Sequence, residues 1–195
     1  MTTETLFNTR EEWLSEAINE CRAIFANENA GDIPAGVKVT CGFPLSAKRA
    51  KHTSIGECWA PAASAANVYE ILISPTVDGA RDVMAILVHE LVHTLPGCMN
   101  HSSPFKRAAT RAGLHAPTGK WGATVPGVTF DNLYADTLTA LGAYPHAALN
   151  VGERKKQGTR LLKAHCPDCG YTIRLTAKWA GQGLPTCVCG GEFTI

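Results

Sequence analysis

No stretch of this chain approaches the roughly 20 consecutive apolar residues that a membrane-spanning helix requires, so we expect no membrane partner. The first residues, Met1-Thr2-Thr3-Glu4, lack the basic and apolar regions of a signal peptide. The formal net charge is only +1, which by itself gives no reason to expect nucleic acid or a membrane surface as a partner. The fractions of hydrophobic (45%) and charged (18%) residues exclude disordered and fibrous classes. We therefore expect a globular, cytoplasmic protein.

The 195 residues are enough for one well-packed domain and a small second one. Residues 151–195 hold seven Lys and Arg against three Asp and Glu, whereas residues 1–150 carry a small net negative charge. Residues 143–160 show only weak hydrophobic periodicity. We predict a first domain at 1–145, a linker at 146–160 and a second domain at 161–195. In a cytoplasmic chain the eight cysteines are expected to be thiols and metal ligands rather than disulfides.

One apolar stretch, residues 83–93, carries the motif His89-Glu90-Leu91-Val92-His93. Its aliphatic residues predict a buried helix, on which two histidines four residues apart lie on the same face. They can occupy two corners of a tetrahedral zinc site. Glu90 lies one residue further round the helix, where it can take a proton from a water at the zinc and pass it to a leaving amine. The alternative is a chance pair of core histidines beside a surface glutamate, which the apolar setting disfavours.

A zinc site of this kind needs a third protein ligand, because a catalytic zinc leaves its fourth position to water. His101 is the best candidate, since Pro96 and Gly97 end the helix and the loop that follows can return to the metal. Cys98 is the alternative, although a thiolate would add negative charge and weaken the metal as a Lewis acid. We expect the other histidines to be ordinary loop or helix-end residues: His52, His115, His146 and His165.

Hydrophobic periodicity elsewhere predicts an α+β protein with helices and a small sheet. The expected elements are a helix at 10–27, strands at 37–43, 56–59 and 68–74, and a loop at 117–129. Short connections favour an antiparallel meander of the three strands. Thr9 and Glu12 have the spacing of a capping box. The residues expected to start the later helices are Asp78, Ser103 and Asp131.

Two cysteine pairs near the C-terminus, each followed by glycine, have the pattern of a zinc ribbon. Four thiolates form a closed structural zinc site, and so small a segment could hardly fold without one. The second pair is Cys-x-Cys rather than Cys-x-x-Cys, so His165 is the substitute ligand if one cysteine is not engaged. The alternative is two disulfides or a redox pair. The four predicted ligands are Cys166, Cys169, Cys187 and Cys189.

Basic and aromatic residues surround this ribbon. Lys and Arg neutralise phosphates and aromatic rings stack on bases, so DNA is a candidate partner of the C-terminal domain. The alternative is a solvated linker next to a small ribbon core. The residues concerned are Arg154, Lys155, Lys156, Arg160, Lys163, Tyr171, Arg174, Lys178 and Trp179.

The pentad, followed by Asn100-His101-Ser102-Ser103-Pro104-Phe105 and a basic helix, resembles the SprT-like (Spartan-type) zinc metalloproteases. The resemblance covers residues 5–115 and, as an arrangement, the C-terminal zinc ribbon. Asn100 and Ser102 stand where that family usually has glycines. The resemblance implies a compact zincin-like metalloprotease domain acting on proteins bound or crosslinked to DNA. It also implies that His89, His93 and His101 bind the zinc and that Glu90 is the catalytic acid/base.

Three functions are compatible with these patterns. The first is a zinc endopeptidase with one catalytic and one structural zinc, whose extended protein substrate pairs with the strand edge at 69–74. Tyr134 and the loop at 117–129 are candidate oxyanion helpers or lids for such an enzyme. The second is a nucleic-acid- or protein-binding module in which zinc is only structural, and this function has no need of Glu90. The third is a zinc hydrolase of small amides.

Overall fold

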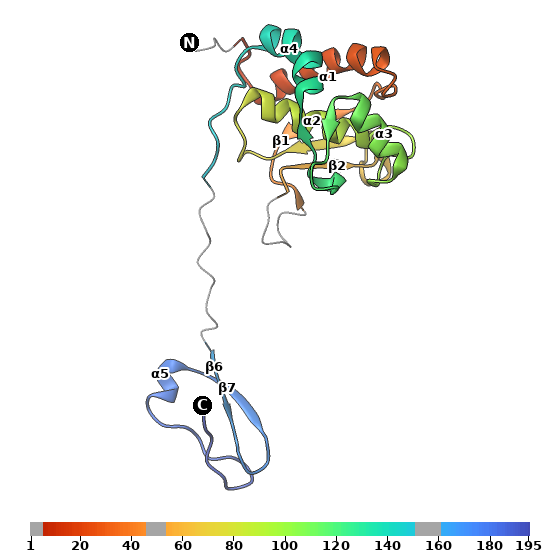
Figure 1. The fold of residues 1–195 in the computed structure, drawn as a ribbon. Coiled ribbons are helices and arrows are strands. Elements are labelled where there is room, and N and C mark those ends of the chain that lie inside the picture. Colours follow the sequence, from red (N-terminus) through yellow and green to blue (C-terminus); the bar gives the residue numbers. More distant parts are fainter. Residues whose placement is uncertain (1–5, 46–53, 151–160) are drawn as a thin grey trace. The chain divides into compact units, whose positions relative to one another are not determined.

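The computed structural model describes residues 6–45, 54–150 and 161–195 (Figure 1). The chain divides into two compact units, Met1–Val151 and Gly152–Ile195, which we describe separately. Helices and short strands both occur, which confirms the predicted mixture of α and β structure. Among the described residues, no helix combines the length and the apolar character needed to cross a bilayer.

The first unit contains the longer elements. Its α-helices in the described ranges are α1 (Arg10–Asn27), α2 (Ala80–His93), α3 (Ser103–Arg111) and α4 (Val128–Leu141). The strands are β1 (Lys38–Cys41), β2 (Gly56–Trp59), β3 (Glu70–Ile73) and the two-residue pair β4 (Leu114–His115) and β5 (Val125–Pro126). The described ranges also contain the 3-10 turns η2 (Pro61–Ala63) and η3 (Trp121–Ala123).

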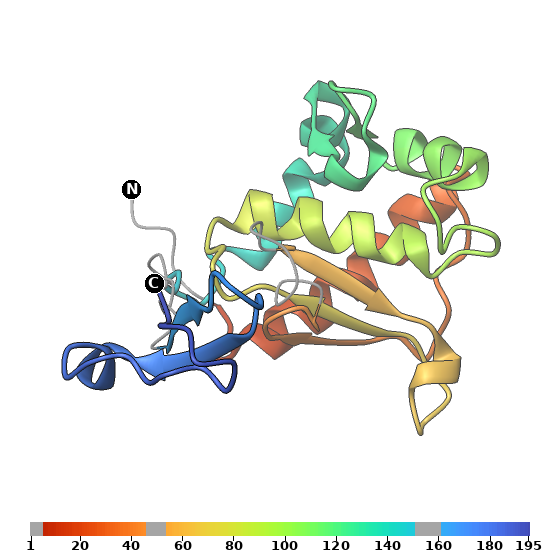
Figure 2. The same ribbon diagram turned by 90° about the horizontal axis from the view of Figure 1, so that it is seen from below.

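The core of the first unit lies between the helices and one face of the three-stranded sheet. Helices α1, α2 and α4 lie on the same side of the sheet, and α2 runs across it (Figures 1 and 2). Ten of the fourteen residues of α2 are buried, including Leu87 and Leu91, and Ile71 and Ile73 of β3 face it from the sheet. The pentad helix is therefore enclosed on most of its circumference, which fixes the direction of its polar side chains.

The order of the three strands differs from the predicted antiparallel meander. β3 lies in the middle, with β1 parallel to it on one side and β2 antiparallel to it on the other. Strands that are adjacent in sequence usually pair, but β1 and β2 do not. The physical reason is burial: β3 carries Ile71 and Ile73, so the central position keeps the most apolar strand away from solvent on both edges.

Helix α1 begins with the predicted capping box. Thr9 Oγ1 accepts a hydrogen bond from the backbone N–H of Glu12 at 3.2 Å, and the Glu12 carboxylate accepts one from the Thr9 backbone N–H in return. The N-cap of α2 is Gly79 instead of the predicted Asp78. The Asp78 carboxylate instead accepts a hydrogen bond from the backbone N–H of Ala148 at 3.1 Å.

The starts of the two following helices also differ from the predictions. The N-cap of α3 is Ser102, one residue before the predicted Ser103. The N-cap of α4 is Gly127, so Asp131 lies within the first turn rather than before it. Its carboxylate pairs with Arg81, with 2.7 Å between Arg81 Nε and Asp131 Oδ1. Acidic residues favour both the N-cap and the first turn, so the sequence pattern alone does not separate the two positions.

The segment after α4 packs back onto the first unit. Tyr144 is buried, and His146 Nε2 and the backbone N–H of Leu149 both donate to the carbonyl oxygen of Pro75 at 2.8 Å. Residues 146–149 of the predicted linker are therefore held against the first unit. The rest of that linker, residues 151–160, lies outside the described residues and includes Arg154, Lys155, Lys156 and Arg160.

The second unit is built on an antiparallel pair, β6 (Leu161–His165) and β7 (Thr172–Thr176), followed by the short helix α5 (Ala177–Ala180). A bridge between His165 and Thr194 brings the C-terminal segment beside β6. The buried core is small and consists of Ala164, Cys166, Cys187 and Phe193. Two of its four residues are cysteines, so hydrophobic burial contributes little here.

Candidate metal centres

The three predicted histidines of the first unit lie together. His89 and His93 project from α2, and His101 comes from the loop that connects α2 to α3. One ring nitrogen from each lies within 4.8 Å of the other two, and 3.3 Å separates His89 Nε2 from His101 Nε2. Two nitrogens bound to one tetrahedral zinc at about 2.0–2.1 Å lie about 3.3–3.4 Å apart. The arrangement could thus hold a metal ion and is compatible with zinc.

The loop that brings His101 back is short and sharply turned. Helix α2 ends at His93, and Gly97 adopts a left-handed conformation with φ +74°, which reverses the chain. Phe105 of α3 is fully buried against all three imidazoles, with ring centroids 5.0 Å from His89, 4.5 Å from His93 and 4.7 Å from His101. This ring keeps water from one side of the histidine group and limits rotation of its members.

Hydrogen bonds to the other ring nitrogens orient two of the ligands. His93 Nδ1 lies 2.8 Å from the carbonyl oxygen of Cys98, and His89 Nδ1 lies 2.7 Å from Thr124 Oγ1. Because a carbonyl only accepts, Nδ1 of His93 carries the hydrogen and Nε2 keeps its lone pair for a metal. Cys98 therefore contributes its carbonyl oxygen to this hydrogen bond. Its thiol is not part of the group of potential ligands, contrary to the alternative prediction. Sequence reasoning did not find Thr124.

Burial keeps the histidines neutral, as metal binding requires. Burial and, to a smaller extent, repulsion from His93 and His101 together lower the pKa of His89 to about 3. Burial also lowers the pKa values of His93 and His101. A neutral imidazole offers its lone pair without first releasing a proton, so these pKa shifts favour metal binding near neutral pH.

Glu90 lies beside the histidines and is 6% exposed. Burial and, to a smaller extent, the nearby charge of Glu57 together raise its pKa to about 8. A divalent cation bound to the histidines would favour the carboxylate and lower this pKa. Gly56 of β2 packs directly on Glu90: a Cβ at this position would overlap the carboxylate and lie 2.7 Å from Ile86 Cγ2. The sequence contains no signal for this contact, because it joins residues 34 positions apart.

We predict that Gly56→Ala destabilises the first unit by about 1–3 kcal/mol, because the added methyl group must displace Glu90 or Ile86 in a packed interior. Chemical denaturation followed by tryptophan fluorescence would measure the loss. Gly42→Ala is the matched control, since a Cβ there makes only an ordinary contact with Leu72 at 3.4 Å. Equal unfolding free energies for the two variants would contradict the prediction.

The histidines and Glu90 open onto a cavity with a volume of about 880 Å³. Helix α2 forms its floor, residues 54–58 including β2 form one wall, and residues 122–126 form another. Part of the loop predicted at 117–129 thus lines the site. Tyr134 does not: its ring is fully buried and stacks on Phe130 with centroids 4.4 Å apart. It is a core residue, which excludes the predicted role as an oxyanion helper.

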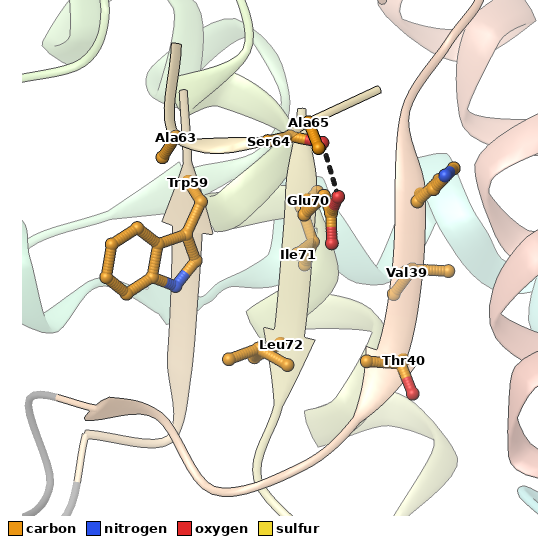
Figure 3. A pocket seen from close by; sticks show the side chains of 10 residues that line it. Val39, Thr40, Trp59, Ala63, Ser64, Ala65, Glu70, Ile71 and Leu72 are labelled. Atoms are coloured by element: carbon orange, nitrogen blue, oxygen red, sulfur yellow. Dashed lines mark hydrogen bonds between the residues drawn. The ribbon is translucent and has the colours of Figure 1, made fainter. Parts of the chain in front are cut away.

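A second cavity, of about 470 Å³, lies on the face of the sheet away from α2 (Figure 3). Trp59, Leu72 and Thr40 line it, and Ser64 Oγ donates a hydrogen bond to the Glu70 carboxylate at its rim. Neither of the two groups of potential metal ligands found in the described residues lies here. The histidine cavity is therefore the stronger candidate for chemistry.

The four predicted cysteines of the second unit also converge. Their sulfur atoms lie within 4.8 Å of one another, with 3.5 Å between Cys166 and Cys189 and between Cys169 and Cys187. Sulfurs at about 2.3 Å from one tetrahedral zinc lie about 3.8 Å apart, so the group is compatible with zinc. All four are free thiols. His165 is not part of the group, and the Cys-x-Cys pair supplies both of its members.

Glycines allow the tight turns of this cluster. Gly170 and Gly190, which follow the two cysteine pairs, have φ values of +75° and +91°. The backbone N–H of Cys169 stabilises the Cys166 thiolate and lowers the pKa of this thiol to about 7. The turns let the four sulfur atoms converge, and the lowered pKa favours the thiolate form of Cys166, which is the form that binds a metal cation.

Comparison of the chain with models of known protein families, with curated proteins and with solved structures finds no match. The class of the protein therefore rests on its own residues. It is an α+β protein with a three-histidine group and a four-cysteine group, each of which could hold a metal ion.

Proposed function

We propose that the first unit is a zinc-dependent endopeptidase of the SprT-like type, with zinc held by His89, His93 and His101 and with Glu90 as general acid/base. The observation that carries this proposal is the placement of Glu90. This residue is 6% exposed, opens onto the same cavity as the histidines and makes no side-chain hydrogen bond within the described residues. Removing a carboxyl group from most of its water costs stability, and a purely structural metal site would not need one here.

In this proposal each residue has a defined task. Bound zinc supplies Lewis-acid polarisation of the scissile carbonyl and of the attacking water. Glu90 accepts the proton of that water and delivers it to the nitrogen of the leaving amine. Thr124 and the Cys98 carbonyl keep two imidazoles in the orientation that presents Nε2. Phe105 shields the histidines from bulk water.

The substrate strand must pair elsewhere than at the predicted edge 69–74, because β3 is the central strand and both its edges are occupied. β2 is the edge strand and lines the cavity. The backbone N–H of Ser74 donates to the carbonyl oxygen of Ile55, so these two residues form a hydrogen-bonded pair. Hydrogen-bonded and non-hydrogen-bonded pairs alternate along antiparallel strands, so the N–H and C=O groups of Gly56 and Cys58 point away from β3. This geometry supports pairing of an extended polypeptide with β2.

The charge of the second unit supports an additional affinity for nucleic acid. Lys163 and Arg174 are exposed and lie directly opposite each other on β6 and β7. Like charges in this position repel, and neither forms an ion pair within the described residues. Phosphate groups would relieve the repulsion. Exposed Tyr171 and Trp179 offer rings for stacking on bases. Substrates associated with DNA fit this combination.

The proposal is tested first by metal content and proteolysis together. The wild-type protein is expected to contain two zinc ions per chain and to cleave an unfolded protein substrate. His101→Ala is expected to contain one zinc ion and to lose cleavage, because it removes a ligand of the proposed catalytic site only. Elemental analysis and a proteolysis assay with and without single-stranded DNA would measure both.

His115→Ala is the matched control, since this exposed histidine lies outside the ligand group. One zinc ion in both the wild type and His101→Ala would favour the alternative, a binding module with structural zinc alone. Cleavage of short amides without any activity on proteins would instead favour the hydrolase of small amides.

A further inference from the structure

Residues 121–126, comprising η3, Thr124 and β5, touch two of the three histidines. Thr124 Oγ1 lies 2.7 Å from His89 Nδ1. Gly122 lies against His101, where a Cβ would be 3.3 Å from Cε1 of the ring. The same segment forms a wall of the cavity from Gly122 to Pro126. It therefore meets both the ligand group and the space a substrate would occupy.

β5 packs on α2, α4 and β4, but few hydrogen bonds hold this segment. η3 has three residues and no side-chain hydrogen bond at its N-cap, and β5 pairs with β4 through two residues only. Val125 is 38% exposed, and the backbone N–H of Ala123 bonds only to the nearby carbonyl of Lys120. Trp121 packs on the edge of the core. Segments with so few hydrogen bonds and so short a strand pairing open at low free-energy cost, so the histidine contacts add to the support of this one.

The direction of the Thr124 hydrogen bond depends on the metal. A hydroxyl can donate or accept, and a neutral imidazole can carry its hydrogen on either nitrogen. When Nε2 of His89 gives its lone pair to a metal, the hydrogen must be on Nδ1, and Thr124 then accepts it. A metal at Nε2 would also draw electron density from the ring and make Nδ1–H a stronger donor, so the hydrogen bond to Thr124 would be stronger with the metal bound. By thermodynamic reciprocity, the hydrogen bond increases metal affinity by the same factor.

We propose that Thr124 is a positioning residue of the metal centre, and that metal binding and the ordering of residues 121–126 stabilise each other. The inference rests on the proposed zinc site of the first unit. It adds that metal binding stabilises a wall of the substrate cavity. A protein without metal in this site would therefore have a less ordered substrate surface as well as no Lewis acid.

The test compares Thr124→Val with Thr124→Ser. Valine keeps the shape and removes the hydroxyl, and is expected to weaken zinc binding at the histidine site about 10–100-fold. Serine keeps the hydroxyl and is expected to remain within about threefold of the wild type. Competition with a chromophoric chelator in the full chain would measure both. Thr139→Val is the control, since that exposed hydroxyl bonds only to Ala135 of its own helix.

Hydrogen exchange supplies a second readout, which can be measured in the wild type alone. In the wild type, peptides covering residues 121–126 are expected to exchange more slowly with zinc than after stepwise removal of zinc by a chelator. Thr124→Val is expected to lose this difference.

Three results would overturn the inference: wild-type affinity in Thr124→Val, equal losses in the valine and serine variants, or wild-type exchange that is indifferent to zinc. If the wild type binds no zinc at the histidines, the proposed function fails instead. The two failures are therefore distinguishable.

Discussion

Glu90→Gln is expected to reduce peptide-bond hydrolysis by about 10²–10⁴-fold while the chain keeps both zinc ions. Glutamine has nearly the shape of glutamate but cannot accept the proton of the attacking water, so general acid/base catalysis is lost. The metal ligands are untouched, which separates this result from that of His101→Ala. Folding should be little affected, because glutamine has nearly the same shape and Glu90 makes no side-chain hydrogen bond among the described residues that the change would break.

The measurement is kcat/KM on an unfolded protein substrate, accompanied by elemental analysis and chemical denaturation. Glu16→Gln is the matched control, since Glu16 is an exposed residue of α1 that bonds only to Asn19. Hydrolysis by Glu90→Gln at the wild-type rate would exclude Glu90 as the acid/base. If neither the wild type nor Glu90→Gln hydrolyses the substrate and both bind DNA or protein equally well, the binding module would be favoured.

Removal of one cysteine of the ribbon is expected to have the largest structural effect. Cys169→Ser should unfold residues 161–195, because their buried core consists of only four residues and two of these are themselves cysteines of the cluster. Zinc contributes about 10–16 kcal/mol of apparent binding free energy in small structural sites, more than such a core can replace. The first unit, with its own core, should remain folded.

Amide hydrogen exchange of β6 and β7 would show this unfolding directly, as would the loss of one zinc ion per chain. Val188→Ser is the control, because Val188 lies between two of the cysteines but is 93% exposed and offers no ligand. Protected amides in β6 and β7 of Cys169→Ser would mean that the second unit folds without metal. Simultaneous loss of the histidine-site zinc would mean that the two sites are not independent.

Local patterns explain most of what could be predicted. The spacing of His89 and His93 follows from helical geometry, and that of the two cysteine pairs from the turns that the glycines permit. The capping box of Thr9 and Glu12 joins residues three positions apart. His101 could be predicted as a ligand because it lies only eight positions after His93 and because Gly97 marks a reversal of the chain. In all these cases the interacting groups are neighbours in sequence.

The predictions failed where distant segments compete for the same space. The central position of β3 depends on burial of Ile71 and Ile73 against helices elsewhere in the chain. Tyr134 has the chemistry of an oxyanion helper, but its side of α4 faces the core. A carboxylate at the N-cap and one in the first turn of a helix look alike in the sequence. Only the structure, in which Asp131 pairs with Arg81, places it in the first turn of α4.

The sequence by itself determined the two ligand groups, since each depends on short spacings and on the chemistry of histidine and cysteine. Tertiary structure alone decided what surrounds them. The contact of Gly56 with Glu90, the hydrogen bond between Thr124 and His89 and the edge position of β2 all depend on residues far apart in the chain. Such contacts leave no periodic pattern, because they arise from how whole elements pack and not from the geometry of any one of them.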